Sequence, residues 1–209
     1  MDRDEMIEIE RKYEATGVVA LTKKEALLLV ETSDAERPGY TENIHFIFGH
    51  EKTPWHDNNA ASVVTTDGSR ATAVQMKYAH KNPGNASLPI DFFKKAVSRA
   101  KPNESITLVF NSMQAKILIG KDLETTWVQR ESIVYQHLKE IVFFEPKGTA
   151  EFSGLNLHYL AAAKKMADAA DQPHAKLTLG KTELDPMTIT VENQGTERNY
   201  RLVISPVRL

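Results

Sequence analysis

Residues 62–71 read Ser62-Val63-Val64-Thr65-Thr66-Asp67-Gly68-Ser69-Arg70-Ala71, and this run predicts two β-strands joined by a tight turn. β-branched residues favour strand on the first side of the turn. Asp67-Gly68 is a turn signal, because glycine readily adopts the backbone angles that a tight hairpin needs. Asp67 and Arg70 can pair across that turn. Taken alone, the segment predicts a plain hairpin, and its wider meaning depends on the rest of the chain.

One unit recurs three times along the chain: a short strand, an amphipathic helix, and then two or three strands. In the first copy, Ile7 and Ile9 alternate with Glu8 and Glu10, which predicts a half-buried strand. The helix that follows, from about Thr22 to Ser33, opens with a capping box formed by Thr22 and Glu25.

The second and third copies repeat this order. A helix capped by Asp91 is expected from Phe92 to about Ala100, and one capped by Asn156 is expected to run to about Ala170. The units span about 1–80, 81–145 and 146–209. We expect residues 1–145 to form one complete domain of two units, and residues 146–209 to form a half-domain.

Composition sets limits on the function. The chain has 209 residues, 41% of them hydrophobic, no cysteine and a net charge of -2, so it can bury a core but cannot build a disulfide framework or a thiolate site. No signal peptide or membrane-spanning run is visible, so a cytoplasmic protein is expected. The seven histidines lack ligand spacing, and no nucleophile elbow, Walker loop or dinucleotide-binding motif occurs. We therefore expect no metal, no cofactor and no enzymatic activity.

Basic residues recur on the solvent side of each predicted helix. The second helix is the clearest case, with Phe92, Phe93, Ala96, Val97 and Ala100 on its apolar face. In the third helix the predicted apolar stripe is Tyr159, Leu160, Ala163 and Ala167. A solvated helix face explains any one of these patterns. If the three helices share one surface, that surface permits sequence-independent contact with phosphates through Lys23, Lys24, Lys94, Lys95, Arg99, Lys164 and Lys165.

Four segments resemble the bacterial DNA sliding clamp, the beta subunit of DNA polymerase III. Residues 63–71 resemble its Thr-Asp-Gly-His-Arg-Leu segment, and residues 36–41 are similar to its Arg-Pro-x-Leu-Thr-Gly segment. Residues 156–160 resemble an Asn-x-x-Tyr-Leu helix start. The C-terminus, Val203-Ile204-Ser205-Pro206-Val207-Arg208-Leu209, resembles the clamp ending Met-Pro-Met-Arg-Leu. The matches cover a middle domain and the second half of a last domain.

The resemblance implies an α+β clamp fold of repeated strand–helix–strands units, with antiparallel sheets outside and helices on the inner face around duplex DNA. It also implies an outer pocket for short peptides of polymerases and repair proteins. Carried over residue by residue, the pocket comprises Tyr40, Thr66, Gly68, Ser69, Arg70, Ala71, Val203, Ser205, Pro206, Val207, Arg208 and Leu209. Ser69, Ala71, Ser205 and Val207 depart from the clamp pattern, and the loss of two methionines predicts narrower or weaker peptide preferences.

Two functions remain open at this stage. The first is a sliding-clamp-like processivity factor, a homo-oligomer that encircles DNA and tethers a polymerase. The second is a clamp-fold regulator or decoy that binds partner peptides without encircling DNA. An enzyme built on this scaffold is a third class that no motif in the sequence supports.

Overall fold

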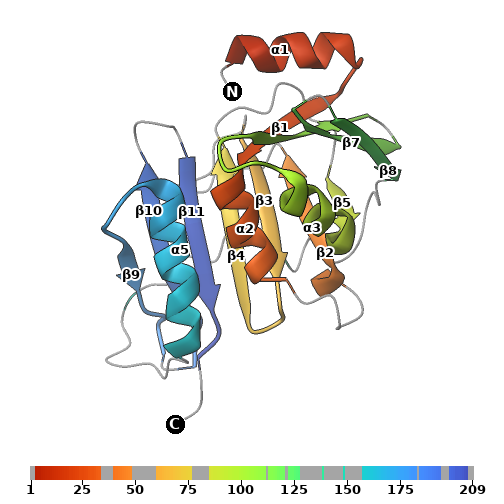
Figure 1. Ribbon diagram of the computed structural model, residues 1–209. Helices are drawn as coiled ribbons and strands as arrows, with labels where there is room; N and C mark the ends of the chain where they lie inside the picture. Colours follow the sequence, from red (N-terminus) through yellow and green to blue (C-terminus); the bar gives the residue numbers. More distant parts are fainter. Residues whose placement is uncertain are drawn as a thin grey trace.

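The computed structural model describes residues 3–33, 40–48, 60–76, 85–111, 113–120, 122–127, 138, 148, 157–182, 184–193 and 198–206, with only the backbone of Arg3, Tyr40, residues 122–127 and Leu157. It is an α+β fold in which a layer of helices covers one face of two antiparallel sheets (Figure 1). The expected fold class is confirmed.

From each helix onward, the described elements follow the predicted repeat. The first unit comprises β1 (Gly17–Thr22), α2 (Lys23–Glu31), β2 (Asn43–Phe48), β3 (Ala61–Thr66) and β4 (Arg70–Met76), with a 3-10 turn η1 (Tyr40–Glu42) before β2. The second comprises β5 (Ala86–Pro89), α3 (Ile90–Arg99), β6 (Ser105–Phe110), β7 (Gln114–Ile119) and β8 (Asp122–Trp127). The third comprises η2 (Leu157–Tyr159), α5 (Leu160–Ala170), β9 (Lys176–Thr178), β10 (Met187–Asn193) and β11 (Arg198–Ile204).

The first two units exchange their first strands. One sheet has the order β1-β6-β7-β8, so β1 of the first unit pairs with β6 of the second. The other sheet begins β5-β2-β3-β4, so β5 of the second unit pairs with β2 of the first. The third unit extends this second sheet, because β11 pairs with β4 from Arg198↔Met76 to Ile204↔Arg70. The result is a sheet of seven strands that ends at β9.

The predicted strand at Ile7 and Ile9 is wrong. Residues Arg3–Lys12 form a helix, α1, and the first strand of the unit is β1. Met6, Ile9 and Tyr13 recur at helical spacing and pack on Ala15, Val18 and Val109 on the outer face of the four-stranded sheet. Helical spacing of three apolar residues outweighs the alternation of two isoleucines, since only the helix places all three on one face.

Two predicted helix starts have different outcomes. The capping box of α2 is confirmed: the Glu25 amide donates to Thr22 Oγ1 over 3.2 Å, and the Thr22 amide donates to Glu25 Oε2 over 2.7 Å. Asp91 does not cap α3, which begins at Ile90 with Pro89 at the cap position and no side-chain cap bond. Proline suits a helix start because its fixed φ matches the helix and its missing amide is not needed there. Asn156 lies outside the described residues.

One apolar core joins both sheets to the helix layer. The rings of Phe46 on β2 and Phe110 on β6 lie 4.8 Å apart between centroids, and both side chains are fully buried. The predicted apolar face of α3 is confirmed for Phe93, Ala96 and Val97. The predicted stripe of α5 is correct only in part: Tyr159 and Ala163 pack against the core. The fully buried residues of the helix are Ala162, Met166 and Ala170, and Leu160 is 42% exposed.

Candidate functional site

The β3–β4 hairpin and the end of β11 lie side by side. Val203 is paired with Ala71 and Ile204 with Arg70. The backbone pairing continues beyond the strand, since the Ser205 amide donates to the Ser69 carbonyl over 2.9 Å. The two segments that the sequence predicted for one pocket are therefore brought together, although they are far apart in the chain. We call this place the hairpin–tail junction: residues 66–71 and 203–206.

A dense set of hydrogen bonds fixes the turn of the hairpin. Asp67 Oδ1 accepts from the amides of Ser69 and Arg70, each over 2.9 Å. Thr66 Oγ1 donates to the Arg70 carbonyl over 2.7 Å and accepts from the Gly68 amide over 3.1 Å. Gly68 has a φ of 88°, in the region that glycine adopts without strain. The predicted turn at Asp67-Gly68 is confirmed, and its geometry depends on these residue types.

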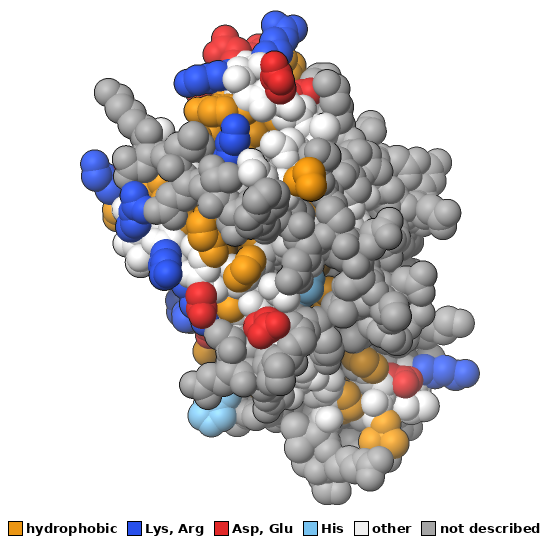
Figure 2. Space-filling view, turned by 90° about the vertical axis from the view of Figure 1, so that its right-hand side faces the viewer, with side chains coloured by type: hydrophobic (Ala, Val, Ile, Leu, Met, Phe, Trp, Pro, Cys, Tyr) orange, Lys and Arg blue, Asp and Glu red, His pale blue; other side chains and the backbone are white. Residues whose placement is uncertain are grey.

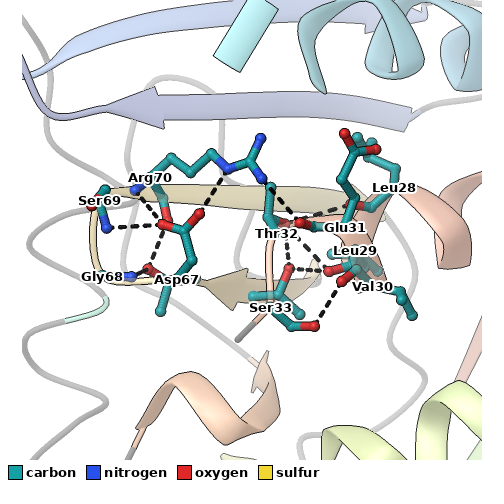
Figure 3. A network of polar contacts seen from close by, with 12 residues as sticks. Leu28, Leu29, Val30, Glu31, Thr32, Ser33, Asp67, Gly68, Ser69 and Arg70 are labelled. Carbon is teal, nitrogen blue, oxygen red and sulfur yellow. Dashed lines mark hydrogen bonds and ion pairs between the residues drawn. The ribbon is translucent and has the colours of Figure 1, made fainter. Parts of the chain in front are cut away.

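Arg70 is held by three groups at once. Its Nε pairs with Asp67 Oδ2 at 2.9 Å, as the sequence suggested, and its Nη2 donates to the Glu31 carbonyl at the end of α2 over 3.0 Å (Figure 3). The guanidinium carbon lies 5.1 Å from the ring centroid of Tyr159 in η2. Arg70 therefore ties the hairpin to α2 and to the third unit, which positions the hairpin–tail junction.

The predicted pocket residues differ in accessibility. Thr66, Ala71 and Val203 are 5%, 2% and 3% exposed, so they support the junction from beneath. Gly68 and Ser205 are exposed, and Ser69, Arg70 and Pro206 are partly exposed. A ligand at this junction would meet mainly these five residues. The side chain of Tyr40 and residues 207–209 lie outside the described part of the chain.

The second candidate surface is the helix layer. Helices α5, α2 and α3 lie side by side, with α2 in the middle, over one face of the sheets (Figure 1). Together they carry seven basic and four acidic residues, a net charge of +3 in a chain whose total is -2. Lys and Arg side chains gather along the left edge of Figure 2, the side on which this layer lies. The predicted basic residues are thus brought to a common face.

The cations of this face are not equally available. On α5, Lys164 pairs with Asp168 at 2.7 Å, and Lys165 pairs with Glu31 of α2. On α2, Lys23 donates to the Ala100 carbonyl and Lys24 donates to the Asp168 carbonyl, contacts that leave their charge unneutralised. On α3, neither Lys94 nor Lys95 pairs with a carboxylate of the described residues; Arg99 is exposed. The positive potential is therefore concentrated over α3 and the start of α2.

A groove of about 500 Å³ runs between α2 and α5. Leu27, Val30 and Ala169 give it apolar walls, and Lys24, Glu31, Lys165 and Asp168 line it with both signs of charge. Because its carboxylates neutralise neighbouring lysines, this groove is less attractive to phosphates than the surface of α3.

A buried polar cluster at the start of β11 was missed by the sequence reasoning. Glu25 and Tyr200 are 1% and 2% exposed, and the Tyr200 hydroxyl donates to Glu25 Oε1 over 2.9 Å. Arg198 Nε lies 3.7 Å from the same oxygen, and its Nη2 donates to the Ala20 carbonyl over 2.9 Å. Burial, and then the Glu25 charge, raise the pKa of Tyr200 well above its usual value. In the sequence, Glu25 was recognised only as a member of the capping box, and that pattern does not predict its hydrogen bond with Tyr200 of the third unit.

Other kinds of site find no support in the described residues. No group of three or more His, Cys, Asp or Glu residues there has the arrangement of a metal site. Within the same residues, no helix combines the length and apolar character needed to cross a membrane.

A helix layer over antiparallel sheets, built from units that exchange strands, defines the clamp fold. The chain has the fold of bacterial DNA polymerase III beta sliding clamps, as the sequence resemblance indicated. It superposes on the *H. pylori* beta clamp in complex with diflunisal with a TM-score of 0.64 at 11% identity, covering 93% of this chain and 67% of that one.

Two further solved structures show the same likeness. The *H. pylori* beta clamp bound to DNA ligase peptide gives a TM-score of 0.61 at 12% identity, over 93% of this chain and 66% of that one. The DNA polymerase III subunit beta from *Pseudomonas aeruginosa* gives 0.56 at 11% identity, over 92% and 66%. The chain thus spans about two thirds of these proteins. No family model and no curated protein matches the sequence.

Proposed function

We propose that this protein is a sliding-clamp-like DNA replication factor, which contacts duplex DNA through its helix layer and binds peptides of a polymerase or other partners at the hairpin–tail junction. In this proposal it is a processivity factor that acts by tethering and not by catalysis, in the cytoplasm, as a homo-oligomer that encircles DNA. Residues 1–145 form a complete clamp domain and residues 146–209 a half-domain.

The observation that carries the proposal is the common basic face. Three helices from three units present a net charge of +3 on one side of a chain whose total is -2. Such a face suits the DNA backbone, which is bound by charge and without reading sequence. Lys94 and Lys95 on α3 pair with no carboxylate of the described residues, so the strongest contacts with DNA are expected there, with Lys23 and Lys24 next to them.

A DNA-binding assay tests this assignment. Exchanging Lys94 and Lys95 together for Glu should weaken binding to duplex DNA regardless of its sequence. It should also lower the slope of log affinity against log salt by roughly 2, since each lost phosphate contact removes about 0.9. The matched control exchanges Lys176 and Lys181, exposed residues of the third unit outside the helix layer, for Glu. Equal losses in both variants would contradict a specific role for α3.

Retention on circular and on linear DNA tests whether the protein encircles the duplex. A closed ring should remain on circular DNA and slide from the ends of linear DNA of the same length. Equal retention on both forms would contradict encircling, while leaving simple DNA binding intact.

The hairpin–tail junction supports the peptide-binding half of the proposal. The *H. pylori* clamp that this chain resembles was solved bound to a DNA ligase peptide. Ser205 is exposed and lies against Ser69, so Ser205→Arg places a bulky cation over the junction without disturbing the core. This variant should lose binding of clamp-binding peptides, whereas Thr182→Arg, in another turn of the third unit, should retain it. Unchanged peptide binding by Ser205→Arg would contradict the location of the site.

The alternative is a clamp-fold regulator or decoy that binds partner peptides without encircling DNA. It is favoured by the neutralised lysines of α5, which leave one part of the helix layer with no excess of positive charge. Peptide binding that Ser205→Arg abolishes, together with no measurable DNA binding by the unaltered protein, would select this alternative.

A further inference from the structure

Helix α1 and the outer face of the four-stranded sheet border a cavity of about 310 Å³. α1 lies across this sheet on the side away from α2 and α3 (Figure 1). Ile9 and Tyr13 of α1 line the cavity from the helix, and Ser105 of β6 and Leu118 of β7 line it from the sheet. The cavity shares no residue with the helix layer or with the hairpin–tail junction.

Backbone hydrogen bonds hold the helix side of the cavity in place. At the end of α1 the Ala15 amide donates to the Glu10 carbonyl over 2.9 Å, and the Glu14 amide donates to the Arg11 carbonyl over 3.4 Å. These two bonds form a Schellman motif, in which Glu14 has a φ of 50°. They fix the position of Tyr13 between the helix and β1. The cavity is therefore formed before a ligand binds, as ligand sites usually are.

The turn before β6 forms part of the cavity rim. Glu104 lines the cavity, its Oε2 accepts from the Lys101 amide over 2.8 Å, and its Oε1 lies 3.9 Å from Lys101 Nζ. A Cβ at Gly120, which also lines the cavity, would lie 3.4 Å from Glu104 Oε1. Gly120 has a φ of 57°, so glycine both permits the turn and keeps the rim open beside Glu104.

Two lysines give the cavity its charge. The ammonium groups of Lys12 in α1 and Lys116 in β7 each lie 5.3 Å from the ring centroid of Tyr13. Neither lysine pairs with a carboxylate of the described residues, whereas the carboxylate of Glu104 is already engaged by Lys101. Positive charge therefore exceeds negative charge beside an apolar wall. This combination suits a ligand with an apolar body and an anionic group.

We propose that this cavity binds a small organic acid with a flat apolar body. The body lies against Ile9, Tyr13 and Leu118, where it can stack on the tyrosine ring, and the acid group meets the ammonium groups of Lys12 and Lys116. The ligand is small because the cavity lies near the lower end of the usual range for ligand sites, about 300–1,000 Å³. The site depends on neither DNA binding nor peptide binding, so its failure would leave the proposed function intact.

Calorimetric titration of the full chain with naphthalenesulfonate, an aromatic anion, tests this proposal. One molecule should bind per chain, and the neutral analogue naphthalenemethanol should bind roughly tenfold more weakly. Exchanging Lys12 and Lys116 together for Gln should lower the affinity for the sulfonate by roughly tenfold at low salt. It should leave the affinity for the alcohol unchanged, because the apolar wall remains. The matched control exchanges Lys94 and Lys95 of the helix layer for Gln and should change neither affinity.

A bulky side chain in the cavity provides a second test. Ser105 lines the cavity and is partly exposed, so Ser105→Trp fills the cavity without entering the core. It should abolish binding of both compounds, whereas Thr182→Trp, in an exposed turn, should retain it, with unchanged circular dichroism in both variants. No binding of naphthalenesulfonate by the unaltered protein at millimolar concentration would overturn the proposal. Binding that survives Ser105→Trp, or equal losses in the two lysine double variants, would also overturn it.

Discussion

Tyr200→Phe removes one hydroxyl from the cluster that joins the third unit to the first. The hydroxyl donates to the buried carboxylate of Glu25 over 2.9 Å and lies 3.4 Å from the Ala169 carbonyl of α5. The phenylalanine ring keeps the packing of Tyr200, so the substitution isolates the hydrogen bond. Glu25 then keeps its bond to the Thr22 amide and its contact with Arg198.

The size of the effect follows from the charge of the acceptor. A hydrogen bond to a charged group contributes about 1.5–3 kcal/mol, more than a bond between neutral groups, and a buried carboxylate that loses it is not resolvated. We expect Tyr200→Phe to lower the free energy of unfolding by about 2 kcal/mol. For a chain of this length, that corresponds to a fall in Tm of about 4–8 °C.

Urea unfolding followed by circular dichroism measures this loss, with Tyr13→Phe as the matched control. Tyr13 is partly buried against the cluster of Ala15, Val18 and Val109, and its ring centroid lies 5.3 Å from the ammonium groups of Lys12 and Lys116, contacts that phenylalanine retains. The control should change stability by less than about 0.5 kcal/mol. Equal effects of the two substitutions would refute the reasoning, because they would show that the Tyr200–Glu25 bond adds nothing.

The same tyrosine predicts a loss of stability at alkaline pH. Burial and Glu25 raise the pKa of Tyr200 above its ordinary value of 10.0, so the unfolded chain loses this proton first. Above about pH 10 the unfolded state binds fewer protons than the folded state, and stability from this group falls by roughly 1.4 kcal/mol per pH unit. Below about pH 10 both states keep this proton, so the group contributes no pH dependence to the free energy of unfolding. Tyr200→Phe should lack this alkaline component in parallel urea titrations.

Three smaller perturbations test the hairpin and the helix cap by urea unfolding. Thr22→Ala removes the cap of α2 and should cost about 1 kcal/mol, while Thr22→Ser, which keeps the hydroxyl, should cost much less. Gly68→Ala places a side chain at a φ of 88° and should cost about 1 kcal/mol, with no such cost for Gly68→Asn, since asparagine tolerates positive φ. Arg70→Lys should destabilise nearly as much as Arg70→Ala, because lysine cannot donate to Asp67 and Glu31 together, and full rescue by lysine would refute this account.

Much of the architecture was predictable because it depends on local sequence patterns. The capping box of Thr22 and Glu25, the turn at Asp67-Gly68 and the apolar face of α3 each depend on neighbouring residues, and each is confirmed. Errors arose where a local pattern fits two structures. The alternation of Ile7 and Ile9 fits a strand, but both lie in helix α1, and Ile9 packs with Met6 on the outer face of the four-stranded sheet.

The sequence predicted that the hairpin and the C-terminal segment lie together, and it did not predict how accessible their residues are. The sequence named the hairpin and the C-terminal segment, and the structure brings residues 66–71 and 203–206 together. It could not show that Ala71 and Val203 are buried, because burial depends on the strands on either side. The ion pair of Lys165 with Glu31 was equally invisible, because its partners come from different units.

By itself, the sequence determined three helices, the strands that follow each of them and the placement of lysines on each helix, since these are periodic properties of short segments. Tertiary structure alone decided which strands pair: β1 with β6, β5 with β2, and β11 with β4. Strand pairing joins backbone groups of any residue type, so the sequence specifies it only through the fit of whole faces. That pairing places the helices side by side and brings the Tyr200 hydroxyl within hydrogen-bond distance of Glu25. It also makes β9 the last strand in the order of the seven-stranded sheet.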